Sequence, residues 1–213
     1  MKLYPIVEGH GEVRAVPVLL RRLFDDAGCH ALSVGSPIRR PASQLRSEEG
    51  VQVAVRLAIL QGDCGAILIL FDGEDECPLA RAKEVAGWAA RVSGSTPCAI
   101  VVAYREYETW FLSALESLRG KRGIRTDAVA PPNPESRRDA KSALEEYMPP
   151  SRGYSETLDQ PAMSALLDLG SAYRRNRSFR RLVSAMAILM RRLGCDPGAW
   201  PPTSWCAADT GTR

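Results

Sequence analysis

The chain of 213 residues is 45% hydrophobic and 25% charged, with a formal net charge of +3, which is ordinary for a globular protein with one main domain. No apolar run approaches the roughly 20 residues that span a bilayer, and no secretory leader follows Met1, so we expect a cytoplasmic protein without membrane contacts. A net charge this small does not by itself indicate a nucleic-acid partner.

The cysteines show no CxxC spacing and mostly lie within or beside apolar segments. They are Cys29, Cys64, Cys77, Cys98, Cys195 and Cys206. In a cytosolic protein this pattern favours reduced, buried thiols over disulfides, and the paired ligands of a structural zinc site are missing.

The first predicted unit is a strand over 2–7, an acidic turn of sequence VEGHGE over 7–12, and a helix over 13–27. Pro5 lies inside the strand and belongs at a strand start, an edge or a bulge, because it has no N–H for a ladder hydrogen bond. Apolar residues at helical spacing predict the helix, which ends near Gly28; they are Val16, Leu19, Leu20 and Leu23.

Strands and helices then alternate along the chain. We predict a strand over 30–36, a loop over 37–47, a helix over 50–61, a strand over 66–71, a helix over 79–92 and a strand over 98–103. The last two strands are continuously apolar, as in strands buried on both faces. The alternation predicts an α/β fold, in which helices flank a parallel sheet and the crossovers are right-handed.

The second half of the chain is predicted to be helical and rich in loops. We expect a helix over 109–118, loops over 119–157 with one helical island at 136–147, helices over 163–173 and 179–193, and an irregular, partly disordered tail after Gly194. The chain therefore divides into a core, 1–118, and a C-terminal helical extension, 119–213, packed on it.

Carboxylates follow each of the three strongest strands. They are Glu8 and Glu12, then Asp72 and Glu74, then Glu106 and Glu108. The carboxyl ends of parallel strands meet at one edge of the sheet, so these residues are expected to converge. In FDGED, Asp72 and Glu74 are alternate residues and would point the same way from an extended strand end. Hard cations such as Mg²⁺ or Mn²⁺ take oxygen ligands, whereas carboxylates crowded together without a cation repel each other.

A second interpretation of these acids is structural. Acids at a helix start are favoured by capping and by the helix dipole, which would account for Glu12, Glu74 and Glu108. Glu8 and Asp72 fit that interpretation less well, because each follows directly on an apolar strand. His10 is either a ligand or base, or a turn residue. The sequence contains no Ser-His-Asp or Cys-His arrangement and no Walker-type loop.

Basic residues cluster away from the acids. The clusters are 39–40, 119–125, 137–138, 174–181 and 191–192. A basic surface around an acidic pocket suits an enzyme that acts on a polyanion, while the alternative is a set of solvated helix faces. The candidate nucleic-acid contacts are Arg174, Arg175, Arg177 and Arg180.

Five segments together resemble known proteins. They are VEGHGE, LFDGEDECP, YREYETWFLSAL, Lys141 with Tyr147, and NRSFRRL. Their order is similar to the order of motifs in the Toprim domain of topoisomerases, bacterial primases and nucleases of the overcoming-lysogenization-defect (OLD) type. More narrowly, the five segments resemble those of the Toprim-like DUF4276 family. The resemblance implies a Toprim-like (Rossmann-like) sheet. It also implies that Glu8 is a metal ligand or general acid/base, and that Asp72 and Glu74 form a metal pair.

The same resemblance implies a second metal at Glu12 with Glu106 or Glu108, and phosphate contacts from Lys141 and the arginines around Arg177. The implied activity is Mg²⁺-dependent cleavage of phosphodiester bonds in nucleic acid, with DNA favoured over RNA. A role in phage defence beside a partner ATPase of the ABC or AAA type is implied as well. Two alternatives remain: a catalytically silent binding or regulatory subunit, and a phosphotransferase or small-molecule phosphohydrolase.

Overall fold

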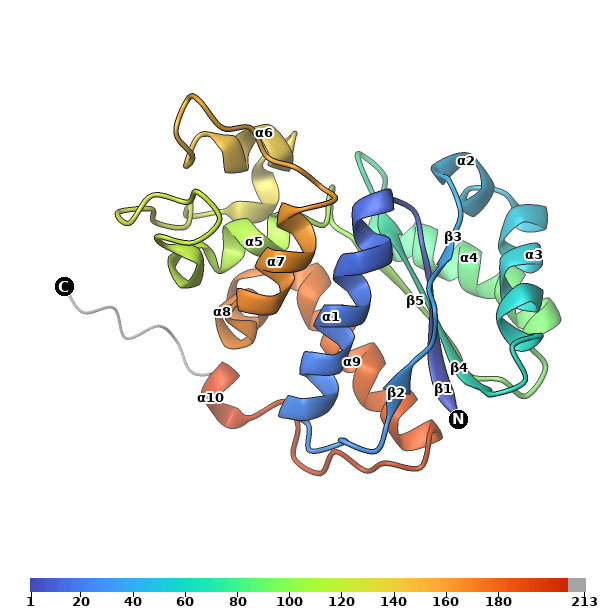
Figure 1. Ribbon diagram of the computed structural model, residues 1–213. Coiled ribbons are helices and arrows are strands. Elements are labelled where there is room, and N and C mark those ends of the chain that lie inside the picture. The colour runs from blue at the N-terminus through green and yellow to red at the C-terminus, as the bar shows by residue number, and fades with distance from the viewer. Residues whose placement is uncertain (207–213) are drawn as a thin grey trace.

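The computed structural model describes residues 1–206, and its centre is a parallel sheet in the order β2-β1-β4-β5, with β3 also paired to β1 (Figure 1). The strands are β1 (Lys2–Val7), β2 (Ser33–Val34), β3 (Ile38–Arg39), β4 (Cys64–Asp72) and β5 (Cys98–Ala103). The predicted α/β fold is confirmed. The predicted strand over 30–36 shrinks to β2, and the predicted loop over 37–47 was wrong in part, since it contains β3 and α2 (Ala42–Leu45).

Pro5 is accommodated by a break in the neighbouring edge strand. The carbonyls of Leu3 and Val7 accept hydrogen bonds from Gly35 and Arg40, on the side of β2 and β3. Because the backbone direction alternates with period two, Pro5 faces that same side. Its missing N–H therefore faces the interruption between β2 and β3, where no ladder hydrogen bond is required.

The apolar run of β4 is buried on both faces of the sheet. Ala66, Leu68 and Leu70 contribute to one hydrophobic cluster, and Ile67, Ile69 and Phe71 contribute to the other. Figure 1 shows α1 (His10–Asp26) and α9 (Arg177–Arg192) on the first face, and α3 (Glu48–Ile59) with α4 (Pro78–Ser93) on the second. This two-sided burial explains why the strand sequence is continuously apolar rather than alternating.

The C-terminal half packs on the α1 face of the sheet. Besides α9, its elements are α5 (Thr109–Ser113), the 3₁₀-helices η1 (Leu115–Leu118) and η2 (Pro134–Ser136), α6 (Ala140–Glu145), α7 (Asp159–Leu166), α8 (Leu169–Arg175) and α10 (Thr203–Cys206). The single helix predicted over 163–173 was wrong, because the chain breaks between α7 and α8. There the Asp168 side chain accepts a hydrogen bond from the Ser171 N–H at 2.7 Å and caps α8. Of the predicted irregular tail, residues 207–213 lie outside the described residues.

One continuous hydrophobic cluster joins the two halves of the chain. It runs from Leu3 in β1 to Trp205 in α10, and Trp110 stacks edge-on against Phe179 at 5.4 Å between ring centroids. The Trp110 indole N–H also donates to the Ser178 hydroxyl at 2.9 Å. The C-terminal helices therefore share one hydrophobic cluster with the strands, while the division of the chain into a core and an extension at residue 118 stays a prediction.

A disulfide joins Cys29 to Cys195 across 166 residues of sequence. The expectation of reduced thiols was wrong for this pair, because the ends of α1 and α9 lie beside each other, which cysteine spacing alone does not reveal. Cys64, Cys77, Cys98 and Cys206 are free. Within the described part of the chain, no helix is long and apolar enough to cross a membrane.

Candidate functional site

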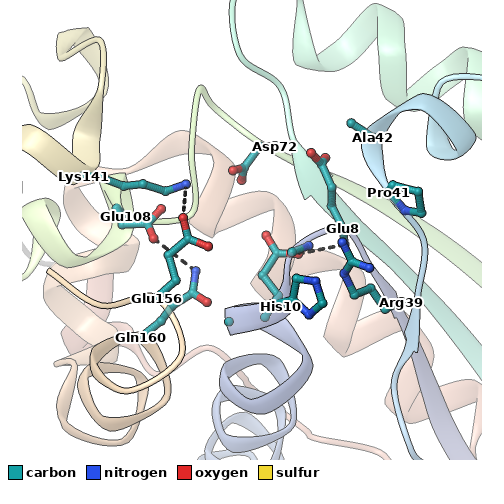
Figure 2. A pocket seen from close by; sticks show the side chains of 13 residues that line it. Glu8, His10, Arg39, Pro41, Ala42, Asp72, Glu108, Lys141, Glu156 and Gln160 are labelled. Atoms are coloured by element: carbon teal, nitrogen blue, oxygen red, sulfur yellow. Dashed lines mark hydrogen bonds and ion pairs between the residues drawn. The ribbon is translucent and has the colours of Figure 1, made fainter.

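A cavity of about 290 Å³ opens where β1 and β4 end (Figure 2). Its side-chain lining is Glu8, His10, Glu12, Arg39, Pro41, Ala42, Asp72, Glu108, Lys141, Glu156 and Gln160, with Gly9 and Gly11. Seven residues were predicted as catalytic or metal-binding, and five of them line this cavity, while Glu74 and Glu106 do not. The predicted convergence of strand-end carboxylates is therefore observed for part of the set.

The turn that presents Glu8 is held by Glu12. One carboxylate oxygen of Glu12 accepts hydrogen bonds from the backbone N–H groups of Glu8, at 2.9 Å, and Gly9, at 3.0 Å. These N–H groups lie at the start of α1, where the helix itself offers no partner. Glu12 therefore has the structural role of a helix-start acid, and it also lines the cavity.

Asp72 and Glu108 are each held in place by hydrogen bonds from different parts of the chain. Asp72 accepts a hydrogen bond from the Tyr107 N–H at 2.9 Å, which ties the end of β4 to the segment after β5. Glu108 is fully buried, and its Oε1 accepts hydrogen bonds from the Tyr154 hydroxyl at 2.9 Å and the Gln160 amide at 3.2 Å. The C-terminal half of the chain thus orients a carboxylate that follows a core strand.

Three buried oxygens at this cavity have no hydrogen-bond partner among the described residues: Glu8 Oε2, Glu108 Oε2 and Gln160 Oε1. An unsatisfied buried acceptor loses its hydration without compensation, which costs about 1–3 kcal/mol, and more when it is charged. All three groups are oxygen donors of the type that Mg²⁺ or Mn²⁺ binds. The donor chemistry of the cavity therefore fits a hard divalent cation.

The raised pKa values of the carboxyl groups at the cavity also favour a bound cation. Burial raises the pKa of Glu12 and of Glu108 to about 7, and repulsion from neighbouring carboxylates adds to the shift of Glu12. Burial, together with the charges of Glu12, Glu108 and Glu8, raises the pKa of Asp72 well above its usual value. Burial also raises the pKa of Glu8. Four carboxylates in this cavity do not ionise together readily unless positive charge is brought to them.

Lys141 supplies positive charge from the start of α6. Burial acts to lower the pKa of this ammonium, but its hydrogen bond to Glu156 and the charges of Glu108 and Asp72 outweigh burial and raise the pKa. The Lys141 Nζ lies 2.6 Å from Glu156 Oε1, as the dashed line in Figure 2 marks. Lys141 is therefore a permanent cation and not a proton acceptor at neutral pH.

A comparison with protein-family models matches residues 7–187 to the model described as "Domain of unknown function (DUF4276)". The chain belongs to the DUF4276 family. The matched range contains every residue that lines the cavity, including those from the C-terminal half. No curated protein and no solved structure matches the chain.

Two predicted metal ligands of this DUF4276 protein, Glu74 and Glu106, do not line the cavity and make contacts elsewhere. Glu74 has a left-handed backbone, with φ 47°, so the extended alternation expected from Asp72 ends before it, and its carboxylate pairs with Arg46 at 3.1 Å. Glu106 accepts a hydrogen bond from the Lys141 backbone N–H at 3.3 Å, at the start of α6. Within residues 1–206, no group of three or more His, Cys, Asp or Glu side chains is arranged to hold a metal. The cavity thus fits an ion bound through one or two carboxylates and waters, as is usual for Mg²⁺, rather than an all-protein cage.

The predicted nucleic-acid arginines of the DUF4276 chain lie at the junction of α8 and α9, away from the lining of the carboxylate cavity. Arg175 pairs with Glu116 at 2.8 Å, and Arg177 pairs with Glu135 at 3.0 Å. Arg180 donates to the backbone carbonyls of Tyr173 and Arg174. These contacts stabilise the helix junction, and a role in binding nucleic acid stays a prediction.

Two residues that line the cavity, Glu156 and Gln160, and Tyr154, which donates a hydrogen bond to Glu108, gave no signal of function in the sequence. Tyr154 and Glu156 lie in the stretch rich in Pro, Arg, Gly and Ser that reads as a loop, and Gln160 falls before the helix predicted at 163. Arg39 was noticed only as half of a basic pair. The position of Glu156 and Gln160 at the site depends on the packing of α7 against α1, which has no local sequence signature.

Proposed function

We propose that this DUF4276 protein is a Toprim-like nuclease that depends on Mg²⁺ or Mn²⁺ and hydrolyses phosphodiester bonds in nucleic acid. The observation that carries the proposal is the meeting of three unpartnered buried oxygens, from Glu8, Glu108 and Gln160, in one cavity at the carboxyl edge of the sheet. The order of the VEGHGE and FDGED motifs, which resembles that of Toprim proteins, supports it.

In this proposal, Asp72 and Glu108 hold the cation together with water molecules, Glu8 acts as the general base, and Glu12 keeps its capping role. A bound divalent cation would polarise the phosphate and lower the pKa of a water molecule. Glu8 takes the proton of the attacking water as its oxygen bonds to phosphorus. The bond from phosphorus to the leaving oxygen breaks, and that oxygen is protonated from solvent. Lys141 neutralises charge on the phosphate oxygens, because an ammonium in a partly water-excluded site stabilises developing negative charge.

The proposed substrate and partners rest on the resemblance to Toprim proteins and on the basic clusters. DNA is favoured over RNA, and the proposed setting is cytoplasmic phage defence with a partner ATPase of the ABC or AAA type. The cationic residues would draw a polyanion toward carboxylates that otherwise repel it.

The alternative function is a catalytically silent binding or regulatory subunit with the same fold. It is favoured by the capping role of Glu12 and by the ion pair that turns Glu74 toward Arg46. Under this alternative the cavity binds a ligand or partner group without hydrolysing it.

The test is metal-dependent cleavage of plasmid and single-stranded DNA by the purified protein. The assay is run with the protein alone and with any ATPase that is encoded beside it. Glu8→Gln and Asp72→Asn are the disabling variants. Glu146→Gln is the matched control, because Glu146 is an exposed acid that pairs with Arg137 outside the cavity. Cleavage that needs Mg²⁺ or Mn²⁺ and is lost only in the first two variants supports the nuclease. Absence of both cleavage and divalent-ion binding in the wild type rejects it.

A further inference from the structure

Lys141 and Glu156 form the ion pair that lies across the rim of the carboxylate cavity (Figure 2). Their side chains retain 40% and 42% exposure, and Nζ and Oε1 are 2.6 Å apart. Two other acids near this ammonium are held by hydrogen bonds of their own: Asp72 accepts from the Tyr107 N–H, and Glu108 accepts from the Tyr154 hydroxyl and the buried Gln160 amide. Glu156 is therefore the one of these three carboxylates that solvent reaches and that can exchange.

The backbone of Glu156 is fixed while its side chain is not. Its carbonyl lies against Gly11 at the start of α1, so closely that a Cβ on Gly11 would come within 2.7 Å of it. Glu156 precedes α7 in a turn, and the structure gives its carboxylate one partner among the described residues, Lys141. The side chain can thus swing away from the cavity without moving α7 or opening the hydrophobic core.

The surroundings of the Lys141 ammonium suit a phosphate group. Carboxylate and phosphate oxygens are equivalent acceptors for a charged donor, so a phosphate can take the place of Glu156. The start of α1 lines the same cavity, and the positive end of a helix of 17 residues favours an anion; there the Glu12 carboxylate accepts the N–H groups of Glu8 and Gly9. Arg39 lines the cavity as well.

We infer that Glu156 occupies the subsite of a substrate phosphate, and that Lys141 exchanges the Glu156 carboxylate for that phosphate when substrate binds. The inference rests on the proposed phosphodiester chemistry, and it identifies the group recognised beside the carboxylates as a phosphate. Glu156 then acts as a competitor, which weakens binding of anions that do not displace it.

The test is a calorimetric titration of the full chain with inorganic phosphate at constant ionic strength. Glu156→Gln removes the competing charge, so phosphate should bind about two- to fivefold more tightly, the range expected for loss of one exposed ion pair. Lys141→Met should abolish phosphate binding. In the double variant, Glu156→Gln should give no gain. Glu146→Gln, which breaks an exposed ion pair elsewhere, should bind phosphate as the wild type does.

An affinity of Glu156→Gln equal to or weaker than that of the wild type overturns the inference. So does a gain from Glu156→Gln that persists in the Lys141→Met background, because a general change in charge would then explain it. Circular dichroism and thermal melting establish that each variant is folded. Binding of Mn²⁺ without phosphate is measured separately. Failure of the wild type to bind Mn²⁺ rejects the proposed metal-dependent function, whereas the phosphate titrations judge the exchange of Glu156.

Discussion

The carboxylate of Glu12 accepts a hydrogen bond from the backbone N–H of Glu8 at 2.9 Å, so the second acid of VEGHGE holds the first in position. Replacing Glu12 by Ala removes the acceptor for two backbone N–H groups, and we expect the free energy of unfolding to fall by about 2 kcal/mol. Glu12→Gln keeps an acceptor oxygen and should lose less than half of that amount. Urea denaturation measures both, and equal losses in the two variants would contradict the capping role.

Gly11 should not tolerate a larger residue. A Cβ there would lie 2.2 Å from Gln160 Oε1 and 2.7 Å from the Glu156 carbonyl, and the latter is backbone that cannot yield without shifting α7. We expect Gly11→Ala to destabilise the protein by about 1–3 kcal/mol, as overpacking does. Gly87→Ala is the matched control, since Gly87 is helical with no atom near its Cβ position, and it should stabilise by up to ~1 kcal/mol. Denaturation curves that rank the two variants the other way would refute this packing.

The carboxylates inside and outside the cavity should differ in their effect on metal affinity. We expect Asp72→Asn to weaken Mn²⁺ binding by about tenfold or more, because loss of an outer-shell partner alone costs roughly 10–100-fold. Glu74→Gln should leave the affinity within about twofold, since Glu74 pairs with Arg46 and does not line the cavity. Electron paramagnetic resonance of free Mn²⁺ gives both constants, and a large loss for Glu74→Gln would restore Glu74 as a ligand.

In the absence of metal, the free energy of unfolding should fall as the pH rises from about 4.5 to about 7. The lower limit is the usual pKa of glutamate, and the upper limit is the raised pKa of Glu12 and of Glu108. In this interval the native carboxyl groups keep protons that the unfolded chain has released. The native state thus binds more protons, so each rise in pH favours unfolding. Urea unfolding in EDTA across this range measures the fall. Glu108→Gln should make it shallower, and parallel profiles for the two proteins would be evidence against a buried ionisable Glu108.

Much of the fold follows from local sequence patterns. The bounds of β5 match the predicted strand over 98–103, and β4 differs from its prediction only at the ends, because runs of residues buried on both faces have a strong signature. The break between α7 and α8 was missed, since it depends on a single capping residue, Asp168. The Cys29–Cys195 disulfide depends on long-range proximity and has no local signal.

The candidate site was predictable where a residue directly ends a buried strand, as for Glu8 and Asp72. Two residues further on, the left-handed backbone at Glu74 ends the extended alternation. Glu74 pairs with Arg46 and does not line the cavity, so its role as a metal ligand stays a prediction. Gln160 was missed for a different reason. It lies in α7 and reaches the cavity because α7 packs against α1. The spacing of apolar residues along one helix does not predict which distant helix will pack against it.

The cavity walls come from the first strand of the chain and from α6 and α7, which are more than a hundred residues later. During synthesis, Glu8 and Asp72 leave the ribosome well before Lys141, Glu156 and Gln160. A nascent chain or a fragment that ends before α6 therefore carries these acids without the residues that orient and neutralise them. The order of elements along the chain delays assembly of the site until most of the protein has been made.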